Sequence, residues 1–186
     1  MSGSPRITFA IPYYRGRDYL SEAIGSVLAQ TVSDWQLLVV DDCGPEPADD
    51  VVAAFHDPRI TYVRNERNLG LAGNWNECVR LTTTPPVTIL HGDDRLLPDY
   101  AARVLAAAEA QPGVTVLFTD TVNIDGDGAP TRTPADIVKG LLPGARATTS
   151  SRATTTSPGC WPGTTSSARP CAYVAISSAT HRSMRR

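Results

Sequence analysis

The sequence contains no acidic residue after Asp136, although the chain continues to Arg186. All 19 aspartates and glutamates lie at or before that position, and residues 141–186 hold six arginines. The overall net charge of −2 therefore combines −8 in residues 1–140 with +6 in residues 141–186. Globular domains ordinarily mix both signs of charge, so the two parts are different kinds of sequence. We expect a folded unit over residues 1–140 and a basic Arg/Ser/Thr/Ala/Pro-rich tail over residues 141–186.

Long apolar runs are also absent. A membrane-spanning helix needs about 20 consecutive apolar residues, and no stretch of this chain approaches that length. The first residues do not show the apolar stretch of a signal peptide either. We therefore expect no transmembrane segment and a cytoplasmic location, with peripheral attachment to a membrane as the alternative. The tail arginines have no interleaved aromatic residues, so nucleic acid is not expected as a partner.

Cysteine pairs are missing as well. The four cysteines form no Cys-x-x-Cys pair and none lies near a histidine at metal-ligand spacing. This pattern excludes the common zinc sites. Free thiols in a reducing compartment are the expected state.

Short apolar runs alternate with segments of helical periodicity in the first 118 residues. The apolar runs predict strands at residues 7–11, 35–40, 60–63, 87–90 and 114–118. The first helical segment has Leu20, Ile24 and Val27 on one face, and others begin near Pro47, include Trp75, or follow Pro98. This alternation predicts an α/β fold with a parallel sheet, in which ligands bind at the carboxyl ends of the strands.

The tail lacks this periodicity. Runs of hydroxyl residues at 148–151, 154–157 and 164–167 are separated by proline, glycine and arginine. Few large apolar residues are available there to offset a backbone ordering cost of about 1–2 kcal/mol per residue. We predict that the tail is largely disordered, with residues 173–176 as its one candidate element.

Two pairs of adjacent aspartates follow two of the predicted strands. Asp41 and Asp42 come after residues 35–40, and Asp93 and Asp94 come after residues 87–90. Carboxylates at a sheet edge can accept hydrogen bonds from a nucleobase or a ribose, and adjacent carboxylates repel unless a cation or hydroxyl donors lie between them. The alternatives are a capped turn for the first pair and an exposed turn for the second.

Four segments together resemble the inverting glycosyltransferases of family 2, over about residues 6–127. They read ITFAIPYYRGRDYLSEAIGSVLAQT at 7–31, WQLLVVDDCG at 35–44, NERNLGLAGNWN at 65–76 and HGDDRLLP at 91–98. Their order, gaps and strand contexts all agree with the family. The resemblance implies the first half of a GT-A fold, a Rossmann-like parallel-sheet sandwich that binds a nucleotide sugar and is incomplete here.

The resemblance also assigns a nucleobase pocket. By analogy with the family, Pro12 and Tyr14 line this pocket. Asp42 is expected to accept a hydrogen bond from the base, and Asp41 to support it from behind.

The remaining family positions lie around the diphosphate. Asn68 and Gly70 match the family's Asn-x-Gly loop, and Asn76 is expected near the diphosphate. In the family's Asp-x-Asp type motif, Asp93 is expected near the ribose or sugar and Asp94 is expected to bind Mg²⁺ or Mn²⁺.

The function implied by the resemblance is transfer of a sugar, with inversion, from a UDP-, GDP- or dTDP-sugar to an acceptor hydroxyl that the sequence does not identify. A divalent ion would stabilise negative charge on the departing diphosphate. Inversion needs a general base, which family members carry in the second half of the domain, where this chain has no acid. No base is assigned, and a catalytically silent nucleotide-binding remnant is the alternative. A nucleotidyltransferase is disfavoured because residues 12–17 contain a single glycine.

Overall fold

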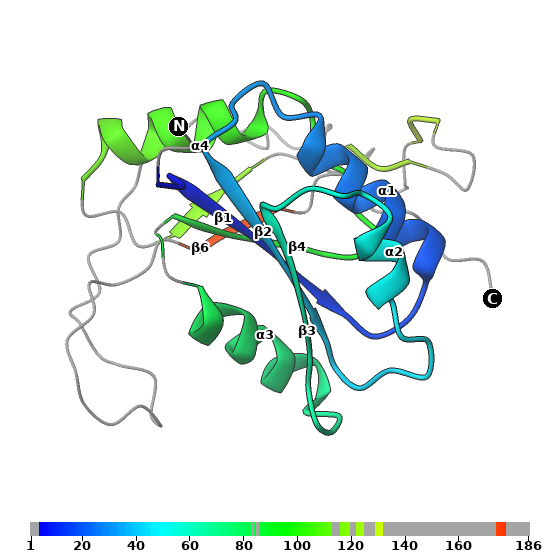
Figure 1. Ribbon diagram of the computed structural model, residues 1–186. Helices are drawn as coiled ribbons and strands as arrows, with labels where there is room; N and C mark the ends of the chain where they lie inside the picture. The colour runs from blue at the N-terminus through cyan, green and yellow to red at the C-terminus, as the bar shows by residue number, and fades with distance from the viewer. Residues whose placement is uncertain are drawn as a thin grey trace, which may run out of the picture.

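The computed structural model describes residues 4–82, 84, 86–112, 116–119, 122–124, 129–131 and 174–177. Strands and helices alternate along the chain (Figure 1). The strands are β1 (Ile7–Tyr13), β2 (Trp35–Asp41), β3 (Ile60–Arg64), β4 (Val87–Leu90), β5 (Val116–Phe118) and β6 (Val174–Ser177). The helices are α1 (Arg17–Leu28), α2 (Asp49–Ala53), α3 (Gly70–Leu81) and α4 (Tyr100–Ala110).

The six strands form one sheet in the order β3-β2-β1-β4-β6-β5, and neighbouring strands in it are parallel. Strand β1 lies between β2 and β4, with Tyr13 opposite Asp41 and Ala10 opposite Ile89. Because parallel strands end at the same edge, the residues after β2 and β4 flank the end of β1. The α/β class with a parallel sheet is thereby confirmed.

The sheet is covered on both faces, as the apolar character of its central strands requires. Helices α1, α2 and α4 pack on one face and α3 packs on the other (Figure 1). Alternate residues of each strand serve the two faces because side chains point to opposite sides with a period of two. The first core includes Phe9, Ile11, Leu37, Val39, Leu20, Ile24, Val27, Val104 and Leu105, and the second includes Ala10, Leu38, Val40, Cys78, Val87 and Ile89.

Strand β1 extends beyond the predicted range of 7–11 and continues through Pro12 to Tyr13. The peptide N–H of Thr8 donates to the carbonyl of Pro86 at 3.0 Å, so the backbone N–H groups of even-numbered β1 residues face β4. Pro12 has no N–H to donate on that side, where the pairing with β4 ends at Ala10. On the other side the N–H of Asp42 donates to the carbonyl of Tyr13 at 2.8 Å, which keeps the strand paired.

Other predicted elements agree in place and differ at their ends. Strand β2 runs one residue further, to Asp41, and β3 runs one further, to Arg64. The candidate element at residues 173–176 corresponds to β6, which lies between β4 and β5. The basic tail therefore contributes a strand to the sheet. Its remaining residues lie outside the described residues.

Candidate functional site

The first aspartate pair is divided between the two faces of the sheet edge. Asp41 is the last residue of β2 and shares its face with Val39, against α1 and α2. Asp42 follows it and makes its contacts with the loop that leads into α3. Adjacent side chains of an extended chain point in opposite directions, so the two carboxylates have different surroundings although they are neighbours in sequence.

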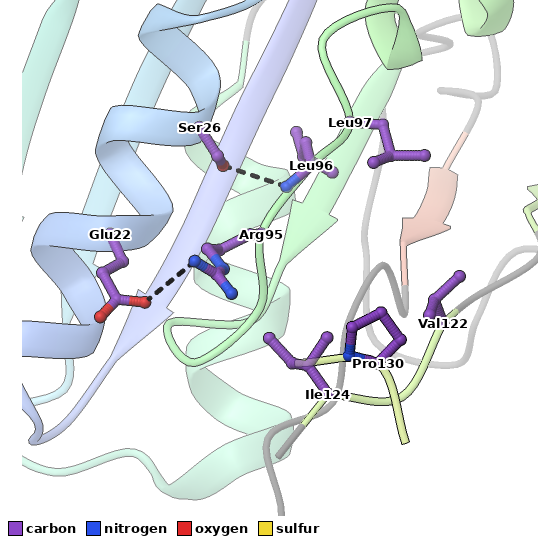
Figure 2. A pocket seen from close by; sticks show the side chains of 8 residues that line it. All are labelled: Glu22, Ser26, Arg95, Leu96, Leu97, Val122, Ile124 and Pro130. Carbon is purple, nitrogen blue, oxygen red and sulfur yellow. Dashed lines mark hydrogen bonds and ion pairs between the residues drawn. The ribbon is translucent and has the colours of Figure 1, made fainter. Parts of the chain in front are cut away.

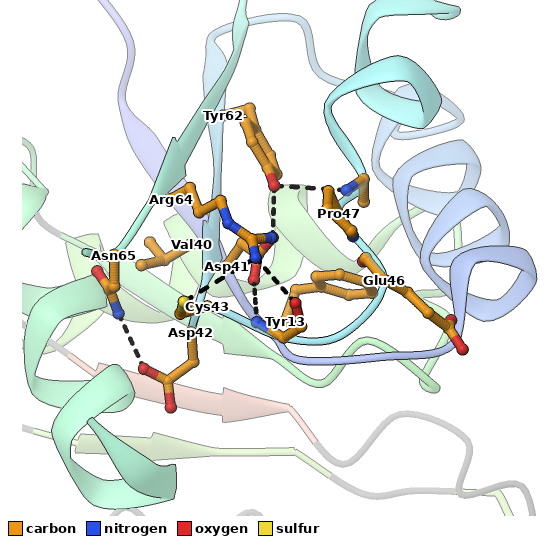
Figure 3. Close-up of polar contacts among 12 residues, drawn as sticks. Tyr13, Val40, Asp41, Asp42, Cys43, Glu46, Pro47, Tyr62, Arg64 and Asn65 are labelled. Carbon is orange, nitrogen blue, oxygen red and sulfur yellow. Dashed lines mark hydrogen bonds and ion pairs between the residues drawn. The ribbon is translucent and has the colours of Figure 1, made fainter. Parts of the chain in front are cut away.

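Asp41 is fully buried, with 0% of its surface exposed, and its carboxylate is enclosed by donors (Figure 3). Its Oδ1 accepts from the N–H of Gly44 at 2.9 Å. Its Oδ2 accepts from the Tyr62 hydroxyl and from the Arg64 guanidinium, with which it forms an ion pair. A buried carboxylate is tolerated when it is paired and hydrogen-bonded. Asp41 therefore connects the loop after β2, through Gly44, with strand β3, through Tyr62 and Arg64.

Asp42 is also buried but is held on one oxygen. Its Oδ1 accepts from the Asn65 side-chain amide at 3.0 Å and from the N–H of Leu69 at 2.8 Å. The same amide of Asn65 donates to Asn74 at 3.1 Å, and Asn74 donates to the carbonyl of Val40 at 3.0 Å. In Figure 3 the second oxygen of Asp42 points away from Asn65. Among the described residues these hydrogen bonds fix the orientation of Asp42 through Oδ1.

The loop after Asp42 packs directly on the end of β1. A Cβ atom added to Gly44 would lie 1.7 Å from the carbonyl oxygen of Tyr14, so only glycine fits there. Cys43 has a φ of 55°, which turns the chain toward this contact. Tyr14 is 45% exposed and Pro12 is half-buried beside it. Pro12, Tyr14 and Asp42 therefore lie at one end of β1 and β2.

The loop before α3 supplies the next set of predicted residues. The Asn68 side chain accepts from the N–H of Gly70 at 2.7 Å, and Gly70 has a φ of +73° at the start of the helix. Asn76 is exposed on α3, whereas Asn74, two residues earlier, is the buried asparagine that contacts the sheet. Residues two apart on a helix do not share a face. The assignment of Asn76 to the diphosphate therefore stays a prediction, and Asn74 is the asparagine that the structure joins to Asp42 through Asn65.

The second aspartate pair follows β4, on the other side of β1 from Asp42. Asp94 is 3% exposed, and its Oδ1 has no hydrogen-bond partner among the described residues. Burial, and then the neighbouring charge of Asp93, raises the pKa of Asp94 to about 7. An unpartnered buried carboxylate oxygen beside a second carboxylate is unfavourable unless a cation or a proton neutralises it.

The donor set fits a small divalent ion bound together with a ligand. In the part of the chain that the structure describes, no group of three or more His, Cys, Asp or Glu side chains is placed to hold a metal. Asp93 and Asp94 offer oxygen atoms only, and Mg²⁺ is commonly held by one or two carboxylates together with substrate phosphates. These residues would hold such an ion only when a diphosphate supplied further oxygens.

A separate hollow of about 580 Å³ lies beside the loop that follows Asp94 (Figure 2). The Arg95 guanidinium lies 3.7 Å from the Glu22 carboxylate of α1, and the N–H of Leu96 donates to the Ser26 hydroxyl at 3.1 Å. The remaining lining is apolar, from Leu96, Leu97, Val122, Ile124 and Pro130. Such a lining does not suit a diphosphate.

Three residues of this edge were not found from the sequence. Arg64 and Asn65 follow one another at the end of β3, and Asn74 lies on α3. Strand β3 pairs with β2, with Arg64 opposite Asp41. The sequence offered one signal for Arg64 and Asn65: they are polar residues at the end of a predicted strand, and parallel strands bring their ends to one edge. The sheet order needed to place it beside Asp41 is not encoded in the local pattern.

The chain is an α/β domain with two aspartate pairs at the carboxyl edge of a parallel sheet, the edge at which such folds commonly bind ligands. The model of the family "Glycosyl transferase family 2" matches residues 8–169. The chain therefore belongs to glycosyl transferase family 2. The match continues past residue 140, and the division of the chain at that residue stays a prediction.

Two bacterial relatives agree with this membership. The chain is 32% identical over 123 residues to the succinoglycan biosynthesis protein ExoO of Rhizobium meliloti, a match that covers 66% of this chain and 35% of that protein. It is 33% identical over 108 residues to WcaA of Escherichia coli, a putative colanic acid biosynthesis glycosyl transferase, covering 57% and 39%. The chain thus spans little more than a third of the length of these relatives.

Solved structures share the fold. Staphylococcus aureus TarS, solved in complex with UDP-GlcNAc, matches with a TM-score of 0.59 and 18% identity over 68% of this chain and 37% of that chain. The mannosyltransferase PcManGT of Pyrobaculum calidifontis, solved with GDP-Man and Mn²⁺, matches with a TM-score of 0.54 and 24% identity over 64% and 36%. The GT-A fold expected from the sequence is confirmed. Among the described residues no helix has the length and apolarity to cross a membrane.

Proposed function

We propose that this chain binds a nucleoside diphosphate sugar together with a divalent ion at the edge formed by Asp42 and Asp94. It would transfer the sugar to an acceptor hydroxyl with inversion. The observation that carries the proposal is the unpartnered buried oxygen of Asp94 at the end of β4, across β1 from Asp42. Membership of glycosyl transferase family 2 supports the same reaction class.

The base would lie between Tyr14 and Asp42. The second oxygen of Asp42 would accept from a base N–H, and the exposed ring of Tyr14 offers an apolar surface for the base, with Pro12 beside it. Asp41 would act indirectly, because its carboxylate is fully enclosed.

The diphosphate would lie toward Asp93 and Asp94. Asp94 would hold Mg²⁺ or Mn²⁺, and Asp93, which is half-buried, would face the ribose or sugar. The ion supplies positive charge that stabilises the departing diphosphate. Asn68 and Gly70 would shape the loop on the opposite side, and Asn76 would approach from α3. PcManGT, solved with GDP-Man and Mn²⁺, supports metal use by analogy.

The nucleotide stays open between UDP, GDP and dTDP. TarS was solved with UDP-GlcNAc and PcManGT with GDP-Man, so the similar structures do not favour one base. We propose a nucleotide sugar of this class, with no nucleic-acid partner. The acceptor is not assigned, and the cytoplasmic location expected from the sequence stays a prediction.

A titration tests binding. UDP, GDP and dTDP are titrated calorimetrically with and without Mn²⁺ into the full chain and into Asp94→Ala. We expect at least one nucleotide to bind in the presence of Mn²⁺, and the substitution to remove most of the Mn²⁺-dependent affinity. No heat with any nucleotide and Mn²⁺ would end the proposal.

Turnover separates the enzyme from a catalytically silent remnant. Both bind a nucleotide, but only the enzyme transfers or hydrolyses the sugar. Release of radiolabelled sugar from the matching donor is therefore measured with the full chain, and Asp94→Ala serves as the blank. Binding without release above that blank favours the silent remnant.

A further inference from the structure

We infer that Arg64 is a positioning residue for the nucleobase. It would hold Gly44 against the end of β1. The inference rests on the proposed function, because it concerns the same pocket. Arg64 would not touch the ligand. It would fix the distance between the two groups that flank the base, Tyr14 and Asp42.

The clamp is built from both arms of one guanidinium. Nη1 of Arg64 pairs with Oδ2 of Asp41, and Nη2 donates to the carbonyl of Gly44 at 2.9 Å. Oδ1 of Asp41 accepts from the N–H of the same glycine at 2.9 Å. The ion pair therefore holds both backbone polar groups of Gly44. Arginine is suited to this because its planar fork carries several donors in a fixed geometry.

Gly44 transmits the clamp to Tyr14. The glycine lies so close to the Tyr14 carbonyl that a Cβ atom would be 1.7 Å from that oxygen. The chain between Asp42 and Gly44 is the single residue Cys43, which has a φ of 55°. We expect a displaced Gly44 to release Tyr14 and to shift the backbone of Asp42, whose carboxylate is still hydrogen-bonded to Asn65 and Leu69. Both walls of the proposed base pocket depend on the position of one glycine.

Two tyrosines hold the rest of the same loop. The Tyr13 hydroxyl donates to the carbonyl of Glu46 at 2.9 Å, and the Tyr62 hydroxyl accepts from the N–H of Ala48 at 3.4 Å while it donates to Asp41. Burial, with smaller contributions from nearby carboxylates, raises the pKa of Tyr13 to about 12, so it stays a donor. We expect the contacts of Tyr13 with Glu46 and of Tyr62 with Ala48 to remain when Arg64 is replaced, so that the change falls mainly on Gly44 and its neighbours.

Arg59 offers a matched control at the other end of β3. It pairs with Asp57, two residues away, and its guanidinium lies 3.6 Å from the ring centre of Trp35. This ion pair stabilises the fold without contacting residues 42–44. Replacing Arg59 therefore removes an arginine ion pair from the same strand region but leaves the clamp intact.

The test compares a ligand that has a base with one that lacks it. Dissociation constants are measured for the nucleotide that binds best among UDP, GDP and dTDP, and for inorganic pyrophosphate, both with Mn²⁺. The proteins are the full chain, Arg64→Met, Arg64→Lys and Arg59→Met. We expect Arg64→Met to weaken nucleotide binding by about tenfold or more, the scale of losing the hydrogen bond between the base and the Asp42 carboxylate. Pyrophosphate affinity should change by less than about twofold.

The lysine variant separates the clamp from simple charge. Lysine keeps a positive charge near Asp41 but has no second arm for the Gly44 carbonyl. We expect Arg64→Lys to bind the nucleotide with an affinity between those of the full chain and Arg64→Met. Arg59→Met should leave the ratio of the nucleotide and pyrophosphate dissociation constants unchanged. If Arg64→Met does not fold, the ratio of the nucleotide and pyrophosphate dissociation constants of Arg64→Lys tests the role of Arg64 instead.

The outcomes distinguish the two proposals. Equal losses for nucleotide and pyrophosphate, or no loss for the nucleotide, would overturn the role of Arg64 while leaving the nucleotide site in place. A shift of the ratio in Arg59→Met equal to that in Arg64→Met would also overturn it. If the full chain binds no nucleotide, the proposed function itself fails, and the inference fails with it.

Discussion

The side chain of Asn65 donates a hydrogen bond to Oδ1 of Asp42 at 3.0 Å, and this contact sets the direction of the second carboxylate oxygen. Asn65 is itself anchored, because its amide also donates to Asn74 on α3. The chain of contacts connects β2, the loop after β3 and α3 at one edge. A carboxylate fixed in this way needs little reorganisation to accept from a base.

Replacing Asn65 with leucine should weaken nucleotide binding. The variant keeps most of the volume but removes one of the two donors to Asp42, so the carboxylate loses its fixed orientation. A hydrogen bond to a charged group contributes about 1.5–3 kcal/mol, which corresponds to a loss of affinity of about tenfold or more. Calorimetric titration with the best-binding nucleotide and Mn²⁺ measures it. Glu66→Gln, at the exposed neighbouring position, is the control. Equal affinities for Asn65→Leu and Glu66→Gln would contradict this role.

Asp94 should make the metal-free fold less stable as the pH rises. Its pKa is raised from 3.8 to about 7 in the folded chain, so the folded state binds the proton more tightly than the unfolded state does. The free energy of unfolding then falls between about pH 4 and pH 7, and the loss is complete above pH 7. Asp94→Asn avoids this cost.

Urea unfolding of both chains, in the presence of a chelator, checks this expectation. The stability advantage of Asp94→Asn should grow from pH 5 to pH 8 by at least about 1 kcal/mol, since one pKa unit corresponds to about 1.4 kcal/mol. Asp99→Asn, at a partly exposed ion pair with Arg103, controls for the general effect of removing an aspartate. A difference between Asp94→Asn and wild type that does not change with pH would show that burial of Asp94 has no such cost.

The order of strands and helices was predictable because each strand is a short apolar run and each helix has a clear apolar face. Strand ends were less predictable, since they depend on partners. Proline predicts a strand end at Pro12 because it has no N–H to donate. Strand β1 nevertheless continues to Tyr13, because the N–H of Asp42 donates to the carbonyl of Tyr13. The contribution of residues 174–177 to the sheet depends on a contact between distant parts of the chain, which a local pattern does not contain.

The residues of the candidate site that lie in family motifs were predictable from the sequence. The residues that only the packing of strands and helices brings to the site were not. Asp42 and Asp94 stand out as members of pairs after strands, but nothing local distinguishes Asp41 as the fully enclosed member. That difference follows from alternation along β2 and from the arrival of Arg64 on β3. Asn74 and Asn76 look alike in sequence, and only the orientation of α3 decides which one faces the sheet.

Cys78 should be unreactive in the folded chain. Burial is the main cause that raises the pKa of its thiol to about 12, so at pH 8 only about one thiol in ten thousand would be the reactive thiolate. Cys43 is half-buried and should be alkylated before Cys78. Mass spectrometry of peptides after brief iodoacetamide treatment measures both, and urea-unfolded protein shows the full reactivity of Cys78. Equal labelling of Cys43 and Cys78 in the native chain would contradict the buried position of Cys78 on α3.

Gly44→Ala should damage the fold and the nucleotide site together, because the new methyl group would lie 1.7 Å from a backbone oxygen that cannot rotate away. The loop must separate from the end of β1, with a cost of about 1–3 kcal/mol or more, typical of overpacking. Gly25→Ala is the matched control, since nothing lies within 4 Å of a Cβ built at that position of α1. Alanine is the better helix former by about 0.5–1 kcal/mol, so this variant should be more stable than wild type. Urea unfolding measures both, and a Gly44→Ala chain as stable as wild type would show that the loop is not pressed against Tyr14.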